Sequence, residues 1–248
     1  MAEKKPSLTV GKDIPPKVGI ISDIHGNYLA LIKALKIFKK YNINKYIFLG
    51  DAIGYIPSIK ALDIIYKNSR KFLCIKGNHE EMFIKKDTCP TKNKIYLHSL
   101  IRTRISNDAK NYINSWETKL TIKNKEKSFL FIHGSPKDYN NGYVYPDTDL
   151  SQFTVEDDII FMGHSHWAFD RSFNKKRFIN AGSCGLPRDN GKFGSIGIFD
   201  FATLKYITIR FDISETYSIL GSEYPEIDKS VLELRHREKV EIRGEQIV

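Results

Sequence analysis

Five of the seven histidines in the sequence lie within three residues of a glycine, each at the end of a short apolar segment. Two aspartates and one asparagine occupy the same kind of position. Imidazole, carboxylate and amide donors without cysteine suit Mn, Fe, Zn, Ni or Co. A single histidine at a turn is more often a hydrogen-bonded structural residue than a ligand, but a set of this size favours metal binding. The set comprises Asp23, His25, Asp51, Asn78, His79, His133, His164 and His166.

These residues supply too many donors for one tetrahedral ion and instead suit two ions that share Asp51, about 3.5 to 4 Å apart. Two dications bring a charge of about +4, and Asp23 and Asp51 cancel about two units of it. The surplus of about +2, or about +1 after a hydroxide bridges the ions, favours an anionic substrate. Such a centre lowers the pKa of a bridging water to about 7 and stabilises charge on phosphorus. The expected guest is therefore a phosphate.

The elements that must position these residues are short strands alternating with helices. A strand predicted over Lys17 to Ser22 leads into a turn at Gly26, and Asn27 can cap the following helix through its side-chain oxygen. Because this pattern repeats, we expect a mostly parallel sheet whose carboxyl edge carries the polar residues. If strand geometry persists through Asp23-Ile24-His25, the two polar side chains point to one face. The other elements predicted here are strands 46–49 and 72–75 and a helix over 57–66.

Strand signals stop after residue 81, and two helical stretches are predicted before residue 118, the second capped at Ser106. We therefore interpret residues 81–118 as a small helical insertion. A hairpin over 120–132 follows, and the later strands are expected to form a second sheet packed on the first. A helix is expected from Ser214, and the last ten or so residues of the charged tail 221–248 are expected to lack order. The later strands are 159–162, 177–180, 195–201 and 205–211.

Composition places the chain among ordinary globular proteins, with 248 residues of which 41% are hydrophobic and 27% charged. We expect one domain with its core over residues 17–220. The lack of a signal-peptide pattern or a membrane-span pattern predicts a cytoplasmic protein without a membrane partner. The cysteines, Cys74, Cys89 and Cys184, are spaced for neither a disulfide framework nor a zinc ribbon and are expected to be reduced. The net charge of +10 comes from scattered lysines, so nucleic acid is a less favoured partner than a small substrate, and the oligomeric state is not indicated.

Five short motifs follow one another along the chain: Asp23-x-His25, Gly50-Asp51, Gly77-Asn78-His79-Glu80, His133-Gly134 and Gly163-His164-Ser165-His166. Each is weak alone, but their order resembles that of the calcineurin-like metallophosphoesterases. The resemblance runs from about residue 17 to about residue 220. It is strongest to the small prokaryotic phosphodiesterase-type branch, because of the segments Gly54-Tyr55-Ile56-Pro57 and Asn180-Ala181-Gly182-Ser183.

The resemblance implies a four-layer α/β/β/α sandwich and a metal-dependent phosphoric ester hydrolase, with manganese the favoured ion. His79 would stand beside the ligands and donate a hydrogen bond or proton toward the leaving-group oxygen while a metal-bridging hydroxide attacks. The open alternative for His79 is a structural turn histidine. Glu80 would accept hydrogen bonds near a ligand or a helix start. One ion would be bound by Asp23, His25, Asp51 and His166, and the other by Asp51, Asn78, His133 and His164.

The chain also departs from the serine/threonine phosphatases of this superfamily. They carry Asp and Arg shortly after the second motif, where this chain has Gly54 and Tyr55, so the sequence does not indicate what orients His79. Arg188 is a candidate for binding a substrate phosphate through its guanidinium. An equally favoured interpretation is that Arg188 lies on the surface and pairs with Asp189. We expect hydrolysis of small, nucleotide-like phosphodiesters or phosphomonoesters. A nuclease on longer nucleic acid and a metal-binding scaffold without catalysis are the less favoured alternatives.

Overall fold

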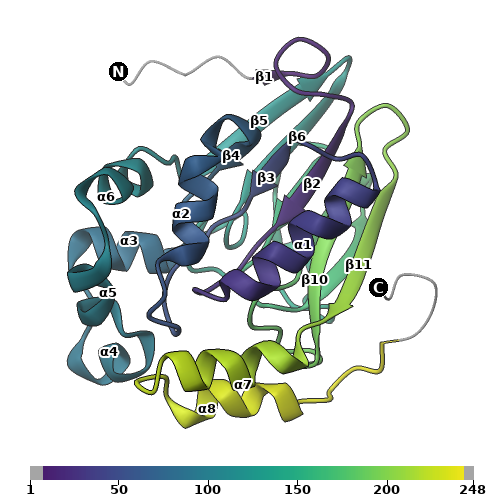
Figure 1. The fold of residues 1–248 in the computed structure, drawn as a ribbon. Helices are drawn as coiled ribbons and strands as arrows, with labels where there is room; N and C mark the ends of the chain where they lie inside the picture. Colours follow the sequence, from purple (N-terminus) through teal and green to yellow (C-terminus); the bar gives the residue numbers. More distant parts are fainter. Residues whose placement is uncertain (1–7, 243–248) are drawn as a thin grey trace.

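The computed structural model describes residues 8–242, which form two β-sheets packed face to face with helices outside the first sheet (Figure 1). The first sheet has the spatial order β11 (Tyr206–Asp212), β10 (Phe193–Asp200), β2 (Lys17–Ile21), β3 (Tyr46–Phe48) and β4 (Phe72–Cys74). The second has the order β1 (Leu8–Thr9), β5 (Lys119–Asn124), β6 (Lys127–Ile132), β7 (Ile159–Met162), β9 (Lys176–Ala181) and β8 (Ala168–Phe173). Strands β2, β3 and β4 are parallel, as are β6, β7 and β9.

The alternation of side chains along β2 explains the layers. Val18 and Ile20 are fully buried between the sheets, where they belong to the same cluster as Phe161 of β7. Ile21 faces the other way and packs under the helices α1 (Tyr28–Lys40) and α2 (Lys60–Lys67). The outer face of the second sheet is covered by the segment 139–155, which includes the 3-10 turn η2 (Leu150–Gln152). The α/β sandwich predicted from the sequence is confirmed.

The region predicted to hold two helical stretches contains four helices: α3 (Asn78–Lys85), α4 (Pro90–Tyr96), α5 (His98–Arg104) and α6 (Asn107–Asn114). The extra breaks come from Lys86 and Leu97, whose φ angles of 56° and 55° are left-handed and end a helix. The predicted cap of α6 is confirmed, because the Ser106 side chain accepts a hydrogen bond from the main-chain nitrogen of Ala109 at 3.2 Å. The division of the chain into a core, an insertion and a tail stays a prediction.

Other elements differ from the sequence predictions in places. We expected β10 and β11 in the second sheet, but β10 pairs antiparallel with β2 and returns the chain to the first. Strands β1 and β8 were not predicted, because β1 has only two residues and β8 is an edge strand that mixes polar and apolar residues. Helix α2 begins at Lys60 rather than at residue 57. The remaining elements are η1 (Ser69–Lys71), α7 (Ser214–Glu223), α8 (Lys229–Leu232) and η3 (Glu233–His236).

Three further expectations concern the chain as a whole. The cysteines Cys74, Cys89 and Cys184 are free thiols, as expected. Between residues 8 and 242, none of the helices has the length and apolar character needed to cross a bilayer. The predicted lack of order at the C-terminus falls largely on residues 243–248, which lie outside the described residues.

Candidate metal centre

The eight polar residues singled out in the sequence converge at one end of the sandwich. Each side chain is buried, with exposed fractions between 0 and 9%. They come from the loops that follow five strands of the two sheets, so the carboxyl ends of both parallel segments open onto the same place. Asp23 and His25 follow β2, Asp51 follows β3, Asn78 and His79 open α3 after β4, His133 follows β6, and His164 and His166 follow β7.

The backbone at this place is held in an uncommon conformation. Asp23, His25, Asp51, His164 and His166 all have φ angles between 51° and 62°, in the left-handed region that non-glycine residues rarely adopt. The extended geometry predicted for residues 23–25 is therefore wrong, because β2 ends at Ile21. This backbone conformation costs about 1 to 3 kcal/mol of folding free energy per residue and persists only where the surrounding structure holds it. The main-chain nitrogens of residues 24 and 25 both donate to the Asp51 carbonyl at 2.9 Å, which ties two of these loops together.

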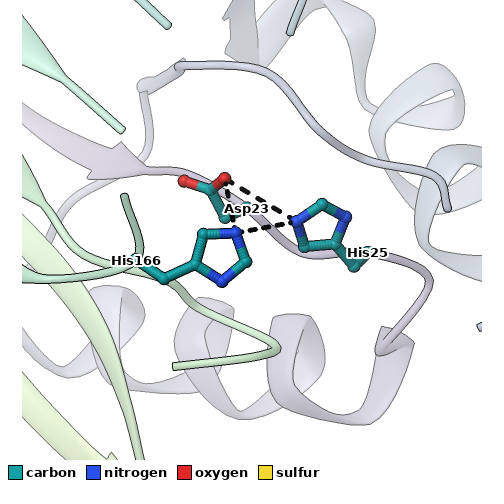
Figure 2. A group of neighbouring side chains, drawn as sticks. All are labelled: Asp23, His25 and His166. Atoms are coloured by element: carbon teal, nitrogen blue, oxygen red, sulfur yellow. Dashed lines mark hydrogen bonds and ion pairs between the residues drawn. The ribbon is translucent and has the colours of Figure 1, made fainter. Parts of the chain in front are cut away.

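Asp23, His25 and His166 form the first group of donors, and Figure 2 shows their polar ends pointing at one another. His25 Nδ1 lies 3.2 Å from the Ile53 carbonyl and His166 Nδ1 lies 2.5 Å from the Leu186 carbonyl. Because a carbonyl can only accept, each Nδ1 carries the hydrogen and each neutral ring turns an Nε2 lone pair inward. The two Nε2 atoms are 3.1 Å apart. Lone pairs that face each other in a buried site repel unless a cation lies between them.

The Asp23 carboxylate completes this group. Its Oδ1 lies 3.2 Å from His166 Nε2 and 3.7 Å from His25 Nε2. This oxygen is buried and receives no hydrogen bond of normal geometry from the described residues. A buried carboxylate oxygen without a donor is costly, whereas a metal ion would satisfy it. The donors therefore fit a bound dication.

Asp51, His133 and Asn78 belong to a second group. The Leu49 carbonyl fixes the hydrogen of His133 on Nδ1, at 2.7 Å, so Nε2 faces the site. That Nε2 lies 3.2 Å from Asp51 Oδ2 and 3.0 Å from Asn78 Oδ1. Asp51 Oδ2 is also 3.6 Å from His25 Nε2. One Asp51 oxygen thus faces both groups, which is the arrangement that a shared ligand requires.

His164 is held from the opposite side. Its Nε2 lies 3.1 Å from the Asn141 carbonyl, which leaves Nδ1 as the donor available to the second group. Its ring centroid is 4.0 Å from that of Tyr143, which belongs to the same loop as Asn141. The loop that follows β6 therefore both orients His164 and brings aromatic residues to the centre.

The charges of the site are strongly coupled. Burial acts to raise the pKa of Asp23 and of Asp51, but attraction to His166 and His133 respectively outweighs it and holds both pKa values well below the ordinary range. Burial lowers the pKa of His166 to about 4 and that of His164 to about 3. For His133 burial acts in the same direction, but attraction to Asp51 prevails and raises its pKa to about 9. Without an ion, His164 and His166 are therefore neutral while His133 holds a proton beside Asp51. Metal binding requires ionised carboxylates and neutral imidazoles, so an ion would displace the His133 proton.

Glu80 ties the loops of the second group together. Its Oε2 accepts hydrogen bonds from the main-chain nitrogens of Asp51 at 2.8 Å and Gly77 at 2.9 Å. Its Oε1 accepts from those of Ala52 at 2.8 Å and Ile53 at 3.3 Å. This agrees with the acceptor role expected from the sequence. The carboxylate therefore fixes the loop that carries Asp51 against the start of α3.

His79 and Arg188 border the two groups. The main-chain nitrogen of His79 donates to Asp51 Oδ1 at 2.9 Å, and its ring lies close enough to His25 and Asp51 to form a third group of donors. Arg188 donates to the Tyr55 hydroxyl at 3.0 Å. Its expected alternative partner, Asp189, is instead engaged by the buried Arg210 through two hydrogen bonds of 2.7 and 2.9 Å. The roles of the residues at this centre stay predictions.

Sequence reasoning missed three residues near the centre. Nε2 of His98 in α5 lies 3.1 Å from Nδ1 of His79. Tyr143 and Tyr145 lie in the loop after β6 with parallel rings and large exposed fractions. No motif marks these residues, and their distance from the centre in sequence gives no local signal of contact.

The comparisons with known proteins agree with this geometry. A model of the calcineurin-like phosphoesterase superfamily domain matches residues 17–204, a range that includes all eight residues. The uncharacterized protein MJ0912 of Methanocaldococcus jannaschii is 30% identical over an alignment of 231 positions, which covers 84% of this chain and 94% of that protein.

Two solved structures share the fold. The hypothetical protein PH1004 of Pyrococcus horikoshii OT3 has a TM-score of 0.76 and 18% identity, over 91% of this chain and 99% of its own. A metallophosphoesterase of Sphaerobacter thermophilus has a TM-score of 0.72 and 19% identity, over 89% of this chain and 98% of its own.

Proposed function

Because the chain belongs to the calcineurin-like phosphoesterase superfamily, a family of metal-dependent phosphoric ester hydrolases, we propose that it hydrolyses small phosphodiesters or phosphomonoesters with two divalent ions. One observation carries the proposal: three main-chain carbonyls fix the Nδ1 hydrogens of His25, His133 and His166. In their neutral forms these three rings therefore turn Nε2 lone pairs toward two buried carboxylates. Cations relieve the repulsion among these donors.

The residues divide into two sets of four that share Asp51. When bound, the ions supply polarisation of the phosphoryl oxygens and a lowered pKa of a bound water. Manganese as the ion and the cytoplasm as the location remain predictions from the sequence. The first set is Asp23, His25, Asp51 and His166, and the second is Asp51, Asn78, His133 and His164.

Arg188 is proposed to bind a substrate phosphate. Its positive charge is close enough to His166 to help burial lower the pKa of that residue, so it lies beside the first group. Its guanidinium donates to the Tyr55 hydroxyl and also interacts with the Tyr143 hydroxyl, and these neutral phenols leave its charge uncompensated. A planar guanidinium binds phosphate oxygens in pairs. We expect Arg188→Lys to raise KM for phosphate esters more than it lowers kcat.

A nucleoside-containing substrate is supported by the aromatic residues beside the second group. The rings of Tyr143 and Tyr145 are parallel within 2°, with centroids 5.7 Å apart, and 48% and 37% of these residues are exposed. Tyr143 also contacts His164. Exposed aromatic rings stack on nucleobases, with a contribution of about 1 to 3 kcal/mol per base. A nucleotide whose phosphate is at the metal centre could therefore stack its base on Tyr143.

The catalytic proposal is tested by metal analysis and turnover together. The purified protein is loaded with Mn²⁺, its metals are counted by mass spectrometry, and a p-nitrophenyl phosphodiester is assayed beside the monoester. We expect about two ions per chain and turnover of at least one ester. Asp51→Asn should abolish turnover and lower the metal content, whereas Asp108→Asn, at an exposed position on α6, should change neither. A protein that binds no metal and cleaves neither ester would defeat the proposal.

The substrate class is tested with a panel of nucleotides, cyclic nucleotides and dinucleoside polyphosphates beside glycerol phosphate. Tyr143→Leu should raise KM about 5- to 100-fold more for nucleotides than for glycerol phosphate, because only a base can stack on the ring, whereas loss of the hydroxyl contact with Arg188 affects both substrates. Tyr41→Leu is the matched control, since Tyr41 is equally exposed at the end of α1. Cleavage of DNA or RNA that falls steeply with salt, without cleavage of small esters, would favour a nuclease instead.

A further inference from the structure

A chain of three side chains runs outward from the metal centre through His79. His79 Nδ1 lies 3.1 Å from His98 Nε2, and His98 Nδ1 lies 2.7 Å from Thr88 Oγ1. His98 is fully buried and His79 is 2% exposed. The two imidazole rings are nearly perpendicular, at 87°, with centroids 5.1 Å apart. When one of two ring nitrogens at this distance carries a hydrogen, it donates to the other, and the hydrogen bond fixes both rings.

Gly54 explains why the hydrogen-bond partner of His79 comes from α5 and not from the loop after β3. A Cβ atom on Gly54 would lie 2.1 Å from His79 Nδ1, and Gly54 has a φ of +95°. The loop after β3 therefore passes directly against the His79 ring and has no side chain there to orient it. Helix α5 supplies the missing contact because the left-handed Leu97 ends α4 and starts the next helix at His98.

The hydrogen bonds of this chain can run in either direction, because the Thr88 hydroxyl at its end both donates and accepts. Thr88 can donate its hydrogen to His98 Nδ1, which leaves the His98 hydrogen on Nε2. That hydrogen points at Nδ1 of His79, so His79 carries its own hydrogen on Nε2. This direction gives His79 an Nε2–H donor, whereas the reverse direction would place the His79 hydrogen on Nδ1.

We propose that His98 is a positioning residue, which holds His79 with its hydrogen on Nε2 so that this N–H donates a hydrogen bond to the leaving-group oxygen of the phosphate ester. This inference rests on the proposed function, because a hydrogen bond to the leaving group matters only if the protein cleaves phosphate esters. The tautomer of His79 can be measured without turnover. The alternative is that His98 is a structural core histidine that only fills space between α3 and α5. The two readings differ in whether substitution of His98 changes the His79 ring or only the stability of the fold.

The kinetic test compares two esters whose leaving groups differ in how much they depend on a hydrogen-bond donor. His98→Ala should lower kcat for an alkyl phosphodiester about 10- to 100-fold. The same variant should lower kcat for the p-nitrophenyl diester less than about threefold, because nitrophenolate leaves without a donor. KM and metal content should stay unchanged. Thr88→Val should have a smaller effect in the same direction, and His236→Ala, whose ring is exposed, is the control.

The structural test uses ¹⁵N-labelled protein loaded with diamagnetic Zn²⁺. The ring nitrogens of His79 should show one tautomer, with hydrogen on Nε2, in the unsubstituted protein and a mixture in His98→Ala. His98→Gln keeps most of the side-chain volume and an amide donor, so it should fold and restore part of both the spectrum and the alkyl-ester turnover.

The outcomes separate the two proposals. If the unsubstituted protein cleaves no ester, the proposed function fails, and the ring spectrum alone decides whether His98 positions His79. If the spectrum of His79 is the same in His98→Ala, or if kcat falls equally for both esters, the positioning inference is overturned while the proposed function stands. Loss of metal from His98→Gln would also overturn it, because His98 would then support the ligands rather than His79.

Discussion

Glu80→Gln should destabilise the protein far more than its conservative shape suggests. The Glu80 carboxylate accepts four main-chain N–H groups, two on each oxygen. A glutamine amide keeps one of these oxygens, so two buried N–H donors lose their acceptor. Each loss costs about 1 to 3 kcal/mol, or about 2 to 6 kcal/mol in total. For a chain of this size that corresponds to a fall in Tm of about 4 to 24 °C.

The assay is thermal unfolding at pH 8, followed by circular dichroism. Burial and repulsion from Asp51 raise the pKa of Glu80 to about 7, so this pH keeps the carboxylate ionised. Glu81→Gln is the matched control, because Glu81 is partly exposed and pairs with Lys85 at 2.5 Å on the surface, where solvent screens the contact. Metal affinity should fall about 10- to 100-fold in Glu80→Gln alone. Equal melting temperatures for the two variants would refute the role assigned to Glu80.

Three other substitutions or treatments probe the same structure. Gly54→Ala should lower kcat about 100-fold with metal content unchanged, because the added Cβ would displace His79. Gly11→Ala is the control, since Gly11 is also left-handed but has open space around it, and equal kcat in the two variants would argue against the clash. Removing both ions with EDTA should lower Tm by about 11 to 22 °C, or about 5 to 11 °C for each ion, if the free ion concentration is about 100 times Kd, and added Mn²⁺ should restore it. A Tm insensitive to both treatments would count against a bound metal. Asp189→Asn leaves Arg210 buried without its anionic partner, so urea unfolding should show a loss of about 3 to 5 kcal/mol, and a loss under about 1 kcal/mol would contradict this.

The fold was predictable where local pattern determines it. The strands that begin at Lys17, Tyr46 and Phe72 are short apolar runs followed by glycine turns, and the cap at Asn27 accepts the hydrogen bond that its residue type predicts. The place of β10 was not predictable, because pairing with β2 joins residues almost 180 positions apart and depends on the packing of whole sheets. The left-handed break at Leu97 was missed for a different reason, since leucine gives no turn signal.

The candidate site was predictable as a set but not in its connections. Parallel strands bring their carboxyl ends together, so residues after β2, β3 and β4 had to meet at one edge. The sequence could not supply the partner of His79, because His98 reaches it only through the path of two short helices. The carbonyls that orient the imidazoles were equally hidden, since every residue carries one and only the fold selects among them.

The central claim is that two metal ions lie side by side with Asp51 between them. Anomalous diffraction from a crystal grown with Mn²⁺, measured at the manganese edge, tests it most directly. The account predicts two peaks about 3.5 to 4 Å apart, one beside Asp23, His25 and His166 and the other beside His133 and His164. A single peak, or peaks away from Asp51, would contradict it.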